Sequence, residues 1–437
     1  MRAVCAGCGA VAEFAAGLPF ACPAAADGDD VDHVMTRELA AQPGEALVGD
    51  ATTTQPFARY RHRLSAHAVA LENGWTEADF TALVADLDGR IAAIDGAGFD
   101  RTPLVRLEAA ERELGMSAQG TVWGKLDATS VSGSHKARHL FGILLNLLVR
   151  EKQTGEPRKP LAIASCGNAA LAAAVVARAA DWPLQVFVPM DAEPAVLTRL
   201  AELQATVEQC PRLAGEVGDP TVARFREAVA QGALPFCCQG NENGLTIEGG
   251  ETLGYELVEQ LAELGQGLDR VLVQVGGGAL MSAVVQALEY AVRVGALPKM
   301  PRLHAVQTHG CYPLVRAHHR ALAELEKHGP VALSDRMRHH RSEFMWPWET
   351  TPHSVAHGIL DDETYDWRVL VEAMLQTGGS PVLVTEEALV AARAAAQQAT
   401  GVAVSATGAA GLAGLHTLGQ QIGPEERVAV VLSGCER

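Results

Sequence analysis

The strongest constraint on the fold is a repeated alternation of short apolar segments with helical patterns. Five apolar segments of four or five residues begin at Leu161, Leu184, Val271, Leu303 and Val428. Longer stretches with apolar residues three and four apart separate them, as in residues 386–399. This order predicts βαβ units and mostly parallel sheets. Only 5% of the residues are aromatic, which also favours an α/β fold over an aromatic-rich β-sandwich.

The chain has 437 residues, which is long enough for two or three domains. Residues 1–34 contain three cysteines and are predicted to form a degenerate, ribbon-like segment. Residues 35–100 show helical periodicity, as in Glu77–Leu87, and are predicted to form a helical extension. The alternating β and α pattern begins after this extension.

The chain is acidic, with 35 lysines and arginines against 52 aspartates and glutamates. A net charge of −17 repels a phosphate backbone, so we expect no nucleic-acid partner. The first 26 residues are apolar, but Glu13 and three cysteines make a signal peptide a poor interpretation. No later apolar segment reaches the roughly 18 residues of a membrane span. The nine cysteines are too scattered for a disulfide scaffold and suggest a cytoplasmic protein.

Three cysteines near the start have a spacing typical of zinc sites. Two residues separate Cys5 from Cys8, a spacing that lets two thiolates bind one tetrahedral ion, and Cys22 follows. A second Cys-x-x-Cys pair is missing, so another residue would have to be the fourth ligand. The alternatives are His33, Asp27, Asp29, Asp30 and Asp32. Because structural zinc sites nearly always have four ligands, the sequence favours a metal-free remnant over an intact zinc site.

Three of the apolar segments end in unusual loops. Ser165-Cys-Gly-Asn168 follows the first, Gly276-Gly-Gly-Ala-Leu280 the third, and Ser433-Gly-Cys435 the last. Ligands of open α/β sheets bind at the carboxyl ends of the strands, so we expect one shared site. Three glycines before a helix can bind phosphate through backbone N–H groups alone. The triplet matches neither the dinucleotide fingerprint nor the P-loop, and a tight turn is the structural alternative.

Lys136 lies at the predicted start of a helix. It follows Ser132-Gly-Ser-His135 and precedes the apolar segment 140–148. A cation in the first helical turn opposes the helix dipole, whereas an amine that is neutral or condensed with an aldehyde avoids that cost. An ordinary surface lysine beside a serine cap is the alternative.

Together these motifs resemble the fold-type II enzymes that depend on pyridoxal 5′-phosphate, in the branch of threonine synthases and serine/threonine dehydratases. The resemblance covers about residues 101–437 and rests on five motifs in the family's order. These are Arg101-Thr-Pro-Leu104, Ser134-His-Lys136, Ser165-Cys-Gly-Asn168, Gly276-Gly-Gly-Ala-Leu280 and Ser433-Gly434. The N-terminal cysteines and Pro56-Phe-Ala-Arg-Tyr-Arg61 are similar to threonine synthase-like proteins in particular. The resemblance implies a homodimer, a large cofactor-binding domain of residues 101–154 and 241–437, and a small domain of residues 155–240.

The resemblance also assigns a role to each motif. Lys136 would form a Schiff base with the cofactor and act as acid and base at the substrate's α-carbon. Asn168 would bond the cofactor's phenolic oxygen, and Ser433 would face its pyridine nitrogen. Ser165, Cys166 and Gly167 would bind the carboxylate of a small amino-acid substrate. The cofactor's phosphate would be held by Gly276, Gly277, Gly278, Ala279 and Leu280.

Three further side chains are candidates for the site. His135 stands where the family usually has phenylalanine, so its ring either takes part in catalysis or packs beneath the cofactor. Cys166 stands where related dehydratases often have serine, and is either an acid/base group or a small buried thiol. His357 belongs to a loop that lies on the substrate side in the family, and either contacts substrate or is solvated.

The hydroxyl of Ser433 is a weaker acid partner than a carboxylate, which favours loss of a β-substituent over transamination. We therefore predict a lyase that removes the α-proton of a β-hydroxy amino acid and forms a 2-oxo acid and ammonia. Threonine synthase-like chemistry is the alternative, although it needs a second phosphate site that the sparse basic residues do not suggest. A replacement enzyme of specialised amino-acid biosynthesis is a third.

Overall fold

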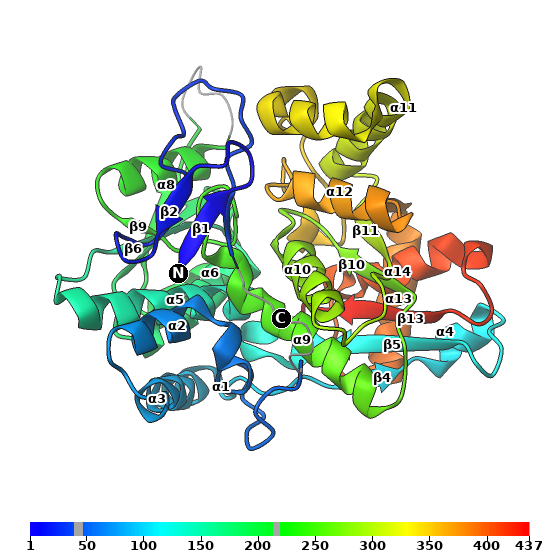
Figure 1. Cartoon of the computed structure of the whole chain (residues 1–437), viewed down its shortest axis with the longest axis horizontal. Helices are drawn as coiled ribbons and strands as arrows, with labels where there is room; N and C mark the ends of the chain where they lie inside the picture. Colours follow the sequence, from blue (N-terminus) through cyan, green and yellow to red (C-terminus); the bar gives the residue numbers. More distant parts are fainter. Residues whose placement is uncertain (39–46, 213–218, 437) are drawn as a thin grey trace.

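Two mainly parallel sheets organise the chain after about residue 100 (Figure 1). The computed structural model describes residues 1–38, 47–212 and 219–436. The larger sheet has the strand order β12-β11-β10-β13-β5-β4, and only the β4–β5 pair is antiparallel. Its strands are β4 (Leu104–Arg106), β5 (Thr121–Leu126), β10 (Arg270–Gln274), β11 (Arg302–Thr308), β12 (Val382–Val384) and β13 (Arg427–Leu432).

Alternate residues of the central strand β10 enter different cores. Val271 and Val273 pack into a core shared with four helices, and Leu272 into a core shared with two others. The first four are α9 (Thr246–Glu263), α10 (Ala279–Arg293), α11 (Pro313–His339) and α12 (Trp367–Thr377), and the other two are α13 (Glu386–Thr400) and α14 (Ala406–Leu418). Because side chains alternate across a strand, this sheet is buried on both faces, and its apolar segments are continuous in the sequence.

The smaller sheet is fully parallel, with the strand order β8-β7-β6-β9. Its strands are β6 (Leu161–Ala164), β7 (Leu184–Pro189), β8 (Thr206–Cys210) and β9 (Leu234–Pro235). The accompanying helices are α5 (Lys136–Thr154), α6 (Asn168–Ala179), α7 (Pro194–Glu202) and α8 (Pro220–Ala230). All alanines of α6 except Ala169 are buried, so this helix packs closely against its neighbours.

The N-terminal part consists of a small antiparallel sheet and three helices (Figure 1). The sheet has the order β2-β1-β3, from β1 (Arg2–Cys5), β2 (Val11–Glu13) and β3 (Met35–Arg37). It runs three residues past the predicted boundary at residue 34. The helices α1 (Pro56–Arg59), α2 (Ser65–Glu72) and α3 (Glu77–Asp95) follow. Thr76 and Asp79 form a capping box at the start of α3.

The α/β fold with mostly parallel sheets is confirmed. All five apolar segments form strands, and residues 386–399 lie within α13. The small sheet is built from residues that fall inside the predicted small domain, although the domain boundaries themselves stay predictions. None of the helices in the described residues is both long and apolar enough to cross a membrane.

Candidate active site

Three chain segments meet beside Lys136, which is the first residue of α5. The amide of Gln274, at the end of β10, donates to the carbonyl of Ser433 at 3.0 Å. The backbone N–H of His135 donates to the Ser433 hydroxyl at 3.0 Å. These two bonds join the ends of β10 and β13 to the start of α5. They place Ser433 next to the lysine turn and next to the strand that leads into the glycine loop.

Three helices around this region begin without a side-chain cap. Among the described residues, no side chain caps α5, α6 or α10, and none of the three has an acidic residue in its first turn. Each start therefore offers backbone N–H groups and a positive dipole end to a bound anion. The buried hydroxyl of Ser134 likewise has no hydrogen-bond partner in the described part of the chain. These orphaned donors fit a ligand that carries several anionic oxygens.

The glycine loop, residues 276–278, turns from β10 into α10 under close packing. A Cβ at Gly276 would overlap the carboxylate of Asp361, and one at Gly277 would lie 2.8 Å from the ring of Tyr365. Gly278 has φ +103°, a conformation that favours glycine. A tight turn and the predicted anion site therefore coincide here. Ala279 and Leu280 are the first two residues of α10, so all five predicted phosphate-binding residues form one buried helix start.

Two carboxylates lie at this loop that the sequence analysis did not single out. The N–H of Gly277 donates to Asp361, and the N–H of Asp366 donates to the Gly277 carbonyl at 3.2 Å. Burial raises the pKa of Asp361, and the charge of Lys136 opposes this shift. Burial and the nearby charge of Asp32 raise the pKa of Asp366 to about 7. In the sequence, the acidic stretch 361–366 could have indicated these two carboxylates, but it resembles an ordinary solvated loop.

His135 and Ser433 share a hydrogen bond inside the site. The Nδ1 atom of His135 lies 2.8 Å from the Ser433 hydroxyl, which also donates to Asp127 at 3.3 Å. Burial, reinforced by the charge of Lys136, lowers the pKa of His135 well below its usual range. The ring is therefore neutral at physiological pH and serves as a hydrogen-bond partner. It also packs edge-to-face against the ring of His139.

A buried ion network continues from Asp127. Arg138 pairs with Asp127 at 2.9 Å and with Glu256 at 2.6 Å, and Lys125 pairs with Glu256 at 2.6 Å. All four side chains are fully buried. Burial lowers the pKa of Lys125 to about 8. The network fixes the start of α5, which carries Lys136, against α9.

The loop after β6 presents the predicted substrate-binding residues at the start of α6. Ser165 is held at the strand by its N–H, which donates to the Phe187 carbonyl at 3.1 Å. Its hydroxyl accepts from the N–H of Gly167 at 3.4 Å. Cys166 is exposed, so the alternative of a small buried thiol is wrong. Partial desolvation still raises the pKa of Cys166, which keeps the thiol protonated at neutral pH. Asn168 begins α6.

The remaining predicted site residues lie elsewhere. His357 is exposed and lines a surface hollow of about 480 Å³ together with His353, Leu360 and Glu386. His357 lies four residues before Asp361 in the chain. Asp361 contacts the glycine loop, whereas His357 lines the surface hollow. Cys5, Cys8 and Cys22 lie together at the N-terminal sheet, and His33 joins them there.

The residues present fit the cofactor that the resemblance implies. A phosphate suits the uncapped start of α10. Lys136 is half-buried and directly follows His135, whose N–H is bonded to Ser433. Asp361 is a feature that disfavours an anion at this position. Its carboxylate takes the Gly277 N–H that a phosphate would use.

Comparison with known proteins agrees with this geometry. Residues 97–434 match the family described as "Pyridoxal-phosphate dependent enzyme". The threonine synthase of Methanosarcina acetivorans is 24% identical over 335 residues, which cover 76% of this chain and 74% of that protein. An L-serine dehydratase of Saccharomyces cerevisiae is 26% identical over 241 residues, or 54% of this chain and 66% of that protein.

Among solved structures, the diaminopropionate ammonia lyase of Escherichia coli shares the fold, with a TM-score of 0.60 and 16% identity. The match covers 92% of this chain and 95% of that one. The family match spans most of the chain and includes all five motifs around Lys136. The chain therefore belongs to the fold-type II family of pyridoxal-phosphate dependent enzymes, and its cofactor is pyridoxal phosphate.

Proposed function

We propose that this protein is a lyase that removes the α-proton of a small β-hydroxy amino acid and releases a 2-oxo acid and ammonia. The charge around Lys136 is the observation that carries the proposal. The charge of Lys136 acts on Asp361 and Asp366, and both carboxyl groups belong to the segment packed against the glycine loop. The nearby guanidinium of Arg138 is bound on both sides by Asp127 and Glu256. Such a site suits a zwitterionic amino acid better than a substrate with a second phosphate.

In this proposal two of the three uncapped helix starts each bind one anionic group. The N–H groups of α10 would bind the cofactor's phosphate, and those of α6, with Ser165, would bind the substrate carboxylate. When bound, pyridoxal phosphate supplies the electron sink for α-proton removal. The amine of Lys136, the first residue of α5, would take that proton.

Ser433 and Cys166 would act as neutral groups. The Ser433 hydroxyl would meet the cofactor's pyridine nitrogen while Asp127 and His135 fix its orientation. Cys166 holds its proton at neutral pH, so it would donate to a departing β-hydroxyl rather than act as a base. The homodimer and the cytoplasmic location stay predictions.

A threonine synthase-like activity is the second candidate. It is favoured by the match to the threonine synthase of Methanosarcina acetivorans, which covers a larger share of this chain than the serine dehydratase match does. That reaction releases phosphate from a phosphorylated homoserine, so the two candidates differ in their products.

The test compares the full-length holoenzyme with the variants Lys136→Ala and Lys152→Ala. Lys152 is an exposed lysine of the same helix and serves as the matched control. We expect the wild type and Lys152→Ala to show the visible absorbance of lysine-bound cofactor, and Lys136→Ala to lose it. Each protein is then incubated with L-serine, L-threonine and O-phosphohomoserine, and ammonia, 2-oxo acid, phosphate and threonine are assayed.

Formation of 2-oxo acid and ammonia from a hydroxy amino acid, abolished in Lys136→Ala, supports the lyase. Release of phosphate with formation of threonine would replace it with the second candidate. A wild type that stays colourless with excess cofactor would refute the role of Lys136 in either reaction.

A further inference from the structure

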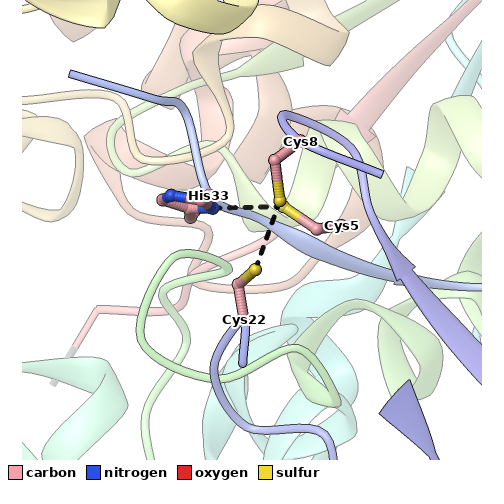
Figure 2. Close-up of side chains that lie close together, drawn as sticks. All are labelled: Cys5, Cys8, Cys22 and His33. Atoms are coloured by element: carbon pink, nitrogen blue, oxygen red, sulfur yellow. Dashed lines mark hydrogen bonds between the residues drawn. The ribbon is translucent and has the colours of Figure 1, made fainter. Parts of the chain in front are cut away.

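Four potential metal ligands converge at the N-terminal sheet, far along the chain from the motifs around Lys136. The ligand atoms of Cys5, Cys8, Cys22 and His33 all lie within 4.8 Å of one another. The Sγ of Cys5 lies 3.4 Å from Nδ1 of His33, and the Sγ atoms of Cys8 and Cys22 are 3.5 Å apart. Figure 2 shows the four side chains pointing toward a common centre.

The backbone around Cys5 and Cys8 forms a turn that presents both thiols on one side. The N–H of Gly9 donates to the Cys5 carbonyl at 2.9 Å, and the Cys5 N–H to the Ala10 carbonyl at 2.8 Å. Gly7 lies so close to the loop before β3 that a Cβ would overlap the carbonyl of Asp32. This close approach brings the turn against the residue that precedes His33.

Hydrogen bonds from surrounding groups orient the proposed ligands, as is usual around metal sites. Nε2 of His33 lies 3.1 Å from a carboxylate oxygen of Asp29, which leaves Nδ1 facing the cysteines. Asp29 is itself held, because it accepts N–H groups from Ala26 and Val31. The N–H of Ala24 donates to the sulfur of Cys22 at 3.4 Å. A carboxylate behind the histidine is a common second layer in zinc sites.

We propose that Cys5, Cys8, Cys22 and His33 bind one Zn²⁺ ion in a closed tetrahedral site, with His33 as the fourth ligand that the sequence pattern lacked. Zn–S bonds of about 2.3 Å place two sulfurs of a tetrahedron about 3.8 Å apart, close to the spacing observed here. The same spacing is far longer than a disulfide bond, so the thiols are available to a metal. Three thiolates and one imidazole suit zinc, and the full ligand set leaves no position for a substrate.

The ion would hold two loops that are docked to different parts of the molecule. Beside His33, Asp32 accepts from Trp367 at 3.0 Å and from Arg368 at 3.2 Å, both at the start of α12. Beside Cys22, the Phe20 carbonyl accepts from the N–H of Gly244, just before α9, at 2.9 Å. The proposed role is therefore structural: zinc fixes the ribbon as a bridge between the segments that lead into α9 and α12.

The first test measures metal in full-length protein purified from zinc-supplemented medium under a reductant that does not bind metals. We expect one zinc ion per chain by plasma mass spectrometry. Cys8→Ser and His33→Ala should lose the metal, whereas Cys210→Ser, which changes a cysteine of the small sheet, should keep it. Asp29→Asn should keep the ligands and lower the zinc affinity by roughly ten- to hundredfold.

The second test does not depend on whether a variant folds. Wild-type protein is stripped of metal with a chelator, reloaded with Co²⁺ and examined by absorption spectroscopy. We expect the thiolate-to-cobalt band and the visible bands of a tetrahedral ion, both abolished by one equivalent of Zn²⁺. Wild-type protein without bound zinc that also gives no cobalt spectrum would overturn the proposal. So would zinc that stays in folded Cys8→Ser and His33→Ala proteins. The readout is independent of the reaction catalysed at Lys136.

Discussion

If the glycine loop binds the cofactor's phosphate as proposed, Asp361 would compete with it for the same backbone N–H. Its carboxylate accepts the N–H of Gly277, and its negative charge would face a bound phosphate. Asp361→Asn keeps a hydrogen-bond acceptor and removes the charge. We therefore expect the dissociation constant for pyridoxal phosphate to fall about tenfold, equivalent to about 1.4 kcal/mol. Fluorescence titration of cofactor-free protein measures it, and Asp362→Asn is the neighbouring control.

The difference in cofactor affinity between wild type and Asp361→Asn should depend on pH in a defined direction. Because burial raises the pKa of Asp361, the wild-type carboxyl is protonated as the pH falls, and its repulsion then disappears. The advantage of Asp361→Asn should be largest in alkaline buffer and shrink in acid. Weaker cofactor binding by the variant at every pH would mean that Asp361 orders the loop instead.

Asp366 should destabilise the folded protein at alkaline pH. Its folded pKa of about 7 is above its unfolded value, so the folded state binds more protons between these two values. The stability contribution of this residue is therefore present at low pH and is lost as the pH rises toward 7. Asp366→Asn should raise the melting temperature clearly at pH 8 and little near pH 5. Thermal unfolding of the cofactor-free protein at both pH values measures this, and an equal gain at both would contradict it.

At the scale of elements, α5 and α9 cross at two glycines. A Cβ at Gly142 would lie 2.8 Å from the Cα of Gly249. A Cβ at Gly249 would overlap the carbonyl of Arg138. Gly249→Ala should therefore push α9 away from the turn that carries Lys136. We expect the free energy of unfolding in urea to fall by about 1–3 kcal/mol, as for other overpacked cores.

Gly89→Ala is the matched control for this prediction. Gly89 lies inside α3, is exposed, and has no atom within 4 Å of its would-be Cβ. Alanine has the higher helix propensity, so this variant should gain about 0.5–1 kcal/mol. A loss of stability at Gly89 equal to that at Gly249 would show that the close crossing is not the cause.

The sequence was most informative where a local pattern determines the structure. The five apolar segments predicted five strands because strands buried on both faces are continuous apolar runs. The loops at Ser165, Gly276 and Ser433 were found because each follows such a strand directly. The other strands of the two sheets, β4, β5, β8, β9 and β12, were not predicted. β8 is mostly exposed, β4, β9 and β12 have only two or three residues, and a glycine and a lysine interrupt β5.

Contacts between distant segments could not be predicted in this way. Asp361 faces Gly277 across 84 positions of the chain, and His33 reaches Cys5 only after the ribbon has folded. The three cysteines had a recognisable spacing, whereas the histidine had none. The partners of Asp127 and Arg138 were equally hidden, because buried ion pairs leave no periodic signal.

At the scale of the whole molecule, the N-terminal hundred residues complete the folded unit. The family match begins at residue 97, yet α9 carries buried carboxylates whose partners come from earlier residues. Arg59 pairs with Glu259 at 2.8 Å, Arg37 with Glu251 at 2.5 Å, and the N–H of Ser65 donates to Glu248 at 2.6 Å. Without these partners, three carboxylates on the buried helix α9 would lose their main ion-pair or hydrogen-bond partners. Removing one partner of a buried pair typically costs about 3–5 kcal/mol.

Residues 101–437 expressed alone should therefore not fold stably, even though they contain every motif around Lys136. We expect insoluble protein, and soluble protein when residues 1–100 are produced in the same cells as a separate chain. In the full-length protein, Arg59→Ala should lower the free energy of unfolding by about 3–5 kcal/mol, because it leaves Glu259 buried and short of its main partner. Arg90→Ala, which breaks an exposed pair with Asp86, should cost less than about 1 kcal/mol. A soluble 101–437 fragment with the melting temperature of the full chain would show that these pairs hold the extension in place without supporting α9.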